Sequence, residues 1–277
     1  MADRPVALRP SRIRSSILAA VCAVGFIALY ATAMLTPAGQ ALDAASLGTF
    51  PAFRGEGWLA VYGARDLLLL ALLCAAAVAG VECIIRRRWV AAIAGCALIG
   101  ATAVAGLLLK SGLPRPDLGD QAYLYQTFPS GHAAVSLAAV VATIWFGPRW
   151  LRPIVVLVMG SVAVFIAMAS LLSFAHRASD IVGGALMVGA FAGATSAMLG
   201  SPRIRFPSVR AMCGLLASGS VLVGAALYML ALAVLATDQA GNIPILDVIA
   251  ASVTLTVGGV MAVVLVDQYP VRTGATS

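Results

Sequence analysis

A histidine and an aspartate four residues apart form the first pair in this sequence with an evident chemical use. His176 and Asp180 lie at the expected start of a helix, where residues i and i+4 share one face and can hydrogen-bond. A carboxylate on one imidazole nitrogen fixes the tautomer and leaves the other nitrogen free to attack an electrophile. A polar helix start with a capping aspartate explains the same spacing, so the pair alone leaves both interpretations open.

A second candidate group, Ser130, Gly131 and His132, precedes a short apolar segment. Serine is a good N-cap, and glycine lets the backbone come close to a ligand. The unpaired N–H groups and the dipole at the start of a helix favour a bound anion. His132 in that position can hand a proton to a leaving oxygen. A turn with a histidine at the membrane interface is the alternative interpretation.

Two cations, Lys110 and Arg115, flank a turn that contains glycine and proline. Directed at phosphate oxygens, they would stabilise the charge of a phosphoryl-transfer transition state; the alternative is that they anchor a helix end at the interface. A zinc site is not expected, because the two histidines and Asp117, Asp120 and Asp180 lack the usual ligand spacings. No cofactor is expected either.

The composition places these residues in a membrane protein. Of 277 residues, 61% are apolar and 10% are charged, and the mean hydropathy is +1.00, whereas a soluble domain is about half apolar and about a quarter charged. A soluble enzyme, a nucleic-acid-binding protein and a disordered chain are therefore excluded. The net charge of +7 comes from small basic clusters between apolar segments, a pattern that sets membrane topology. The cysteines lie inside apolar segments and are interpreted as small buried hydrophobic residues.

Apolar segments long enough to cross a bilayer, at about 20 residues each, define the elements that must position the candidate residues. Their close spacing and their Ala, Gly, Leu and Val content predict an all-α fold, a polytopic transmembrane helical bundle rather than a β-barrel. We expect residues 1–200 to form a six-helix core that holds both candidate segments, and residues 211–266 to form a hairpin of two helices. The eight expected spans are 15–37, 66–85, 89–109, 132–147, 154–174, 181–199, 211–236 and 247–266.

The distribution of basic residues predicts the orientation in the membrane. Most of the 18 basic residues fall in segments that are cytoplasmic if the N-terminus is cytoplasmic, among them Arg86 to Arg88. Both termini are then cytoplasmic, and the two candidate segments emerge together on the extracytoplasmic side of a plasma (inner) membrane. The first apolar segment is longer than the apolar region of a signal peptide, about 7–15 residues, and is expected to remain as a helix.

Taken together, these motifs resemble those of the type-2 phosphatidic acid phosphatase superfamily, the integral-membrane lipid phosphate phosphatases. The similarity extends over residues 40–200. The matching positions, in order and in approximate spacing, are Arg115-Pro116, Pro129-Ser130-Gly131-His132, and His176 with Asp180.

The resemblance implies a role for each candidate residue. His176 would be the nucleophile that forms a phosphohistidine, with Asp180 to orient it. His132 would be the general acid that protonates the leaving oxygen. The residues implied to hold the phosphate are Lys110, Arg115, Ser130 and the backbone N–H of Gly131, with Arg177 as a further candidate.

Two positions depart from the family pattern. Four residues separate Lys110 from Arg115, where the family usually has six, and two residues turn a helix by about 200°. The arginine expected six residues before the nucleophile is replaced by Ser170. A hydrogen bond to a charged group is worth about 1.5–3 kcal/mol, so its loss would slow the reaction roughly ten- to a hundredfold. Alternative sources of the missing cation are Arg54, Arg65 and Arg177.

The sequence thus predicts a metal-independent lipid phosphatase that acts on a phosphomonoester or diphosphate at the extracytoplasmic face, with a polyprenyl phosphate or diphosphate favoured as substrate. A lipid phosphotransferase with the same residues is one alternative, and a non-catalytic membrane protein that has lost part of the phosphate site is another. The expected partners are the lipid substrate and the bilayer, and no nucleic acid. The oligomeric state does not follow from the sequence.

Overall fold

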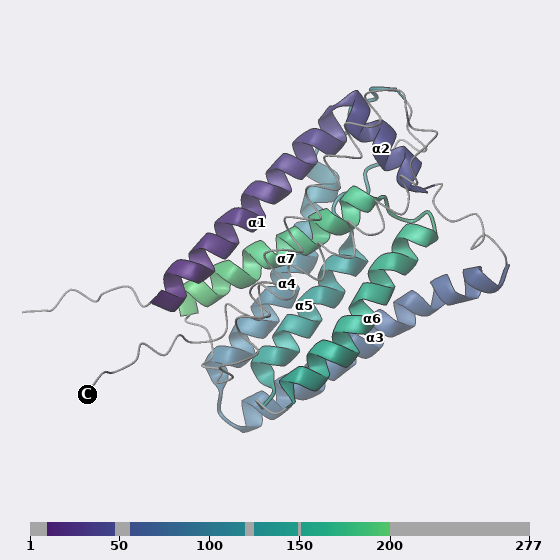
Figure 1. Ribbon diagram of the computed structural model, residues 1–277. Coiled ribbons are helices and arrows are strands. Elements are labelled where there is room, and N and C mark those ends of the chain that lie inside the picture. The colour runs from purple at the N-terminus through teal and green to yellow at the C-terminus, as the bar shows by residue number, and fades with distance from the viewer. Residues whose placement is uncertain (1–9, 48–55, 120–124, 149–150, 200–277) are drawn as a thin grey trace, which may run out of the picture.

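The structure, a computed structural model, describes residues 10–47, 56–119, 125–148 and 151–199. All regular secondary structure in these ranges is helical (Figure 1). The predicted hairpin at 211–266, with the last two predicted spans, lies outside the described residues. The helices are α1 (Pro10–Leu35), α2 (Pro37–Leu47), α3 (Glu56–Ile85), α4 (Trp89–Gly112), α5 (Gly131–Phe146), α6 (Arg152–Leu172) and α7 (Ala178–Leu199).

The helices have the length and surface of a membrane protein. Within the described residues, four apolar stretches are long enough to cross a bilayer, and α5 and the apolar part of α6 are shorter. Large hydrophobic side chains face outward, such as Leu67 and Leu107, each 70% exposed, which suits contact with lipid. The prediction of an all-α membrane protein is confirmed. The four stretches are Arg12–Leu35, Gly63–Ile85, Trp89–Gly112 and Ala178–Leu199.

Helix α5 lies at the centre of the bundle, where it packs against α3, α4, α6 and α7 (Figure 1). Nearly every side chain from Ala133 to Phe146 is buried, and a helix that is apolar on all sides is typical of such a central position. On one side α1 runs along α7, and on the other α3 packs against α6. The two ends of α5 therefore lie toward opposite ends of the bundle.

The helix ends follow local sequence signals. Ser130 caps α5, because its side chain accepts a hydrogen bond from the N–H of Ala133 at 3.4 Å. The helix stops at Gly147, one residue before Pro148. Two features differ from the expected spans. Helix α3 begins at Glu56 instead of residue 66, and α2 was not predicted, since both segments carry polar residues that a search for apolar runs passes over.

Close approach of α7 to the segment before α5 brings the two candidate segments together. A Cβ atom on Gly183 would overlap the ring of Phe128, and one on Gly184 would lie 2.8 Å from the carbonyl oxygen of Ser130. The N–H of Ser130 donates to the carbonyl oxygen of Asp180 at 2.8 Å. Glycine at these two positions of α7 therefore lets the backbones meet where both candidate segments lie.

Candidate active site

The two histidines meet at one end of the bundle. His132 is the second residue of α5, and His176 lies just before α7. Their ring centroids are 6.4 Å apart, with the ring planes tilted by 59°. His176 is buried, whereas the side chain of His132 is 31% exposed. The pair therefore consists of a deep imidazole and a more accessible one, close enough to contact the same small anion.

His176 is held from two sides. Its Nδ1 lies 3.3 Å from Oδ2 of the fully buried Asp180, and its backbone N–H donates to the carbonyl oxygen of Ser170 at 3.0 Å. The N–H of Arg177 donates to the same carboxylate oxygen at 2.9 Å. Since Nδ1 faces the carboxylate, Nε2 is the nitrogen available to a substrate.

Lys110 reaches the start of α5 from the last turn of α4. Its Nζ lies 3.8 Å from the position that a Cβ atom on Gly131 would occupy. The ammonium group therefore lies within van der Waals distance of a methyl group placed at this glycine. The first turn of α5 offers backbone N–H groups and a favourable dipole. The ammonium group of Lys110 and the N–H groups at the start of α5, including that of Gly131, are therefore two positive groups near the histidine at this helix end. Although the spacing between Lys110 and Arg115 is shorter than in the family pattern, the lysine still reaches the start of α5.

Arg65 of α3 also lies at this end of the bundle. Its Nη1 donates to Oγ of Ser173 at 3.1 Å, in the turn just before His176. Its charge is close enough to act on the His132 ring. Of the three alternative sources for the missing cation, Arg54 lies outside the described residues and Arg177 is fully buried. Arg65, with 21% of its side chain exposed, is the one placed between the histidine segments and the surface.

Asp66, the residue next to Arg65, contacts His132 and was not among the predicted site residues. Its Oδ1 lies 2.9 Å from Nε2 of His132 and 3.3 Å from Nε of Arg65. The sequence signal was a charged pair at the start of an expected span, but no spacing rule links residue 66 to residue 132. Each of the two histidines thus has its own carboxylate.

Arg115 and Arg177, both predicted to hold phosphate, have buried partners. Nη2 of Arg115 lies 3.7 Å from Oδ2 of Asp43, with about 2–3% of either side chain exposed. Nη1 of Arg177 donates to Oγ1 of Thr127 at 3.2 Å. These contacts tie the segments around the histidines together, and a direct contact of either arginine with phosphate stays a prediction.

Helix α2 caps the start of α7, a role that the sequence did not suggest. Asp43 accepts hydrogen bonds from the N–H of Ser179 at 3.2 Å and from its hydroxyl at 2.6 Å, and Oγ of Ser46 accepts one from the N–H of Ala178 at 3.1 Å. The pKa of Asp43 is raised to about 7, first by burial and then by the nearby Asp180, against the lowering effect of Ser179 and Arg115. The start of α7 is therefore fixed from outside as well as by Asp180.

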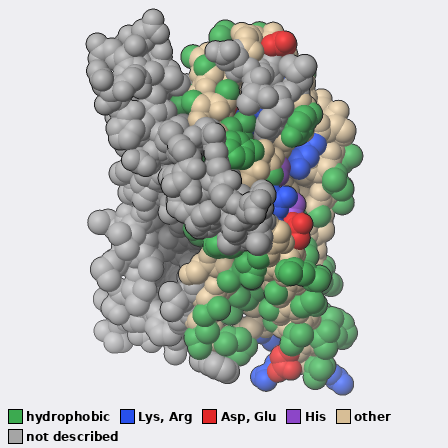
Figure 2. Space-filling model, turned by 90° about the vertical axis from the view of Figure 1, so that its right-hand side faces the viewer, with side chains coloured by type: hydrophobic (Ala, Val, Ile, Leu, Met, Phe, Trp, Pro, Cys, Tyr) green, Lys and Arg blue, Asp and Glu red, His purple; other side chains and the backbone are tan. Residues whose placement is uncertain are grey.

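The charged groups around the histidines reach the surface. Figure 2 shows histidine side chains beside lysine or arginine and an acidic side chain, surrounded by hydrophobic and uncharged surface. Among the residues that the structure describes, no group of three or more His, Cys, Asp or Glu side chains is arranged to hold a metal ion.

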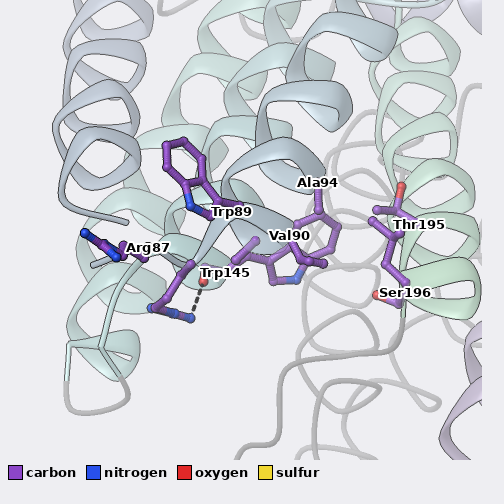
Figure 3. A pocket seen from close by; sticks show the side chains of 10 residues that line it. Arg87, Trp89, Val90, Ala94, Trp145, Thr195 and Ser196 are labelled. Atoms are coloured by element: carbon purple, nitrogen blue, oxygen red, sulfur yellow. Dashed lines mark hydrogen bonds between the residues drawn. The ribbon is translucent and has the colours of Figure 1, made fainter. Parts of the chain in front are cut away.

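A cavity of about 390 Å³ lies at the opposite end of the bundle (Figure 3). The side chains of Val90 and Ala94 from α4 and of Thr195 and Ser196 from α7 border it, together with Trp145 near the end of α5. Trp145 is thirteen residues along α5 from His132, about 20 Å at 1.5 Å per residue. This cavity is therefore separate from the histidine site, and no predicted site residue lines it.

Comparison of the chain with protein-family models, with curated proteins and with solved structures finds no match.

Proposed function

We propose that this protein is a membrane lipid phosphatase that works through a phosphohistidine on His176, as in the type-2 phosphatidic acid phosphatase superfamily that its motifs resemble. The observation that carries the proposal is the 6.4 Å separation of the His132 and His176 rings, with Asp180 on Nδ1 of His176. A nucleophile in near-attack position lies about 3–3.5 Å from its target, and a general acid lies about 2.6–3.2 Å from its oxygen. Rings at this separation can both reach one phosphate.

In the first step Nε2 of His176 attacks the phosphorus. A P–N bond forms as the bond between phosphorus and the lipid oxygen breaks, and His132 gives its proton to that oxygen. The lipid leaves as an alcohol, or as a lipid phosphate if the substrate is a diphosphate. Asp180 stabilises the positive charge that develops on the His176 ring.

In the second step the neutral His132 takes a proton from a water molecule, whose oxygen attacks the phosphorus. The P–N bond breaks, its electron pair returns to Nε2 of His176, and inorganic phosphate leaves. His132 is charged again and His176 is neutral, so both side chains are restored for the next turnover.

The phosphate oxygens would be held by positive groups that surround the two rings. Lys110 and the N–H groups at the start of α5, including that of Gly131, supply two of them. Arg65 supplies the cation expected at Ser170, since its guanidinium reaches the turn that carries His176. Ser130 contributes by capping α5 and thereby fixing these N–H groups.

The proposal includes an eight-span arrangement, with a six-helix core and the C-terminal hairpin at 211–266. Both termini are cytoplasmic and the histidines face the extracytoplasmic side of the plasma (inner) membrane. Support comes from Arg86 to Arg88, which lie between α3 and α4. The guanidinium group of Arg88 donates hydrogen bonds to the carbonyl oxygens of Trp145 and Phe146, at the end of α5 opposite His132. Basic residues at that end favour a cytoplasmic location for it.

The direct test is phosphate release by the purified full-length protein in detergent, with EDTA present. Polyprenyl phosphate, polyprenyl diphosphate and phosphatidic acid serve as substrates, and the polyprenyl lipids are expected to react fastest. Activity should persist in EDTA, because protein cations hold the phosphate. Absence of release from all three lipids, or release only after Mg²⁺ is added, would contradict the proposal. Transfer of labelled phosphate to a second hydroxyl, without free phosphate, would identify a phosphotransferase instead.

A further inference from the structure

We infer that Asp66 is a positioning residue for the general acid: it holds the His132 ring through Nε2, so that Nδ1 carries the proton to the leaving oxygen. The inference rests on the proposed function. Oδ1 of Asp66 lies 2.9 Å from Nε2 of His132, closer than Asp180 lies to His176, at 3.3 Å. This carboxylate comes from α3, far from both motifs in the sequence.

Arg65 links Asp66 to the segment of the nucleophile. Its Nε lies 3.3 Å from Oδ1 of Asp66, and its Nη1 donates to Oγ of Ser173 at 3.1 Å. Oγ of Ser173 donates to the carbonyl oxygen of Ser170 at 3.3 Å, and the same oxygen accepts the N–H of His176 at 3.0 Å. A continuous path of hydrogen bonds therefore runs from the ring of one histidine to the backbone of the other, and it fixes their separation.

The carboxylate also decides which ring nitrogen does the chemistry. A carboxylate that accepts from Nε2 requires a proton there, which leaves Nδ1 to gain and lose the catalytic proton. It stabilises the charged ring, the form that a general acid needs before the lipid leaves. Among the described residues, the charged and titratable groups that act on His132 are Arg65 and Asp66 from α3, and His176. Lys110 from α4 lies beside the neighbouring Gly131.

Asp66 contributes little to the stability of the fold, so a substitution at this position tests its role in the reaction without unfolding the protein. Its side chain is 65% exposed, and exposed ion pairs contribute little to stability. Asp66→Asn keeps the size of the side chain and removes its charge. A matched control is Glu82→Gln on the same helix, because Glu82 also pairs with an arginine, Arg86, at 2.6 Å. It lies sixteen residues further along α3, about 24 Å from Asp66.

The experiment compares phosphate release from a lipid phosphomonoester by the wild-type protein, Asp66→Asn, Asp66→Glu and Glu82→Gln, across pH. We expect Asp66→Asn to lower kcat by tenfold or more with little change in KM, and to move the alkaline limb of the pH profile to lower pH. Asp66→Glu should recover part of kcat, and Glu82→Gln should match the wild type. A lipid diphosphate should be less affected, since its leaving group needs less protonation.

Two failures are distinguishable. If the wild type releases phosphate but Asp66→Asn keeps its kcat and pH profile, the inference is wrong and the proposed function stands. The inference is likewise overturned if Glu82→Gln loses as much activity as Asp66→Asn. If the wild type releases no phosphate from any lipid, the proposed function falls, and the inference falls with it.

Discussion

The imidazole rings of His132 and His176 lie 6.4 Å apart, and each has its own carboxylate partner. Asp180 comes from the first turn of the helix that follows His176, whereas Asp66 reaches His132 from a different helix. The deep histidine and the accessible one thus stand in different environments, as a nucleophile and a proton donor require. The following predictions depend on this division of roles.

His132→Ala should impair the reaction according to the leaving group. A lipid alkoxide needs a proton as it departs, whereas the phosphate released from a diphosphate needs less help. We therefore expect the variant to lose more kcat on a polyprenyl monophosphate than on the corresponding diphosphate. Steady-state phosphate release from both lipids measures the difference. Equal losses on the two substrates would argue against His132 as the general acid.

Arg65→Ala should lower kcat/KM by about ten- to a hundredfold, because a charge-assisted contact with phosphate worth about 1.5–3 kcal/mol is lost. Arg86→Ala is the matched control, since Arg86 directly follows the last residue of the same helix and pairs with Glu82 at its far end. The assay is phosphate release at substrate concentrations below KM. If both variants behave alike, Arg65 does not contribute to phosphate binding.

Gly183→Ala should destabilise the protein by about 1–3 kcal/mol, because the added methyl group overlaps the ring of Phe128. That ring is fully buried and packs against Phe26 and Tyr30, with ring centroids 5.0 and 5.7 Å away, so it has no space to move into. Thermal unfolding in detergent gives the change in stability.

Gly100→Ala provides the control for this prediction. No atom lies within 4 Å of a Cβ at Gly100, and alanine is favoured over glycine in a helix by about 0.5–1 kcal/mol. This variant should be as stable as the wild type or more so. If Gly183→Ala matched it, the close approach of α7 to the Phe128 segment would be wrong.

The contribution of Asp43 to the stability of the protein should fall as pH rises from about 4 to 7. The pKa of Asp43 is raised from its ordinary 3.8 to about 7 by burial, so over this range the folded protein binds more protons than the unfolded chain. Asp43→Asn removes the titrating group and keeps one of the two oxygens that accept hydrogen bonds from Ser179. We expect the unfolding temperature of this variant to vary less across that window. The control Asp117→Asn, at an exposed carboxylate, should keep the pH dependence of the wild type.

The sequence was sufficient to predict those elements and contacts that depend on residues close together in the chain. Apolar runs located the apolar helices, because the bilayer sets a required length. Of the six described helices that match expected spans, five begin within five residues of their expected positions, and four contain a stretch long enough to cross a bilayer. The spacing of His176 and Asp180 predicted their contact, since residues i and i+4 meet on one turn. Ser130 also acts as the N-cap that its position suggested.

The sequence was insufficient to predict contacts that depend on how helices far apart in the chain pack together. Asp66 meets His132 only because α3 lies against α5 at a particular height, and no spacing rule encodes that. Helix α2 was not predicted from the sequence, because it is short and carries the polar residues Gln40, Asp43 and Ser46, which are buried in the structure. Their partners, such as the start of α7, become visible only in three dimensions.

The most direct test of the account is to trap the phosphorylated protein. Wild-type protein and His176→Ala would each be mixed with a lipid carrying a ³²P-labelled terminal phosphate and quenched in alkali, which preserves phosphohistidine. We expect label on the wild-type protein at the peptide that contains His176, and none on His176→Ala. Wild-type protein that releases phosphate without becoming labelled, or a labelled His176→Ala variant, would contradict the claim that both histidines act on one phosphate.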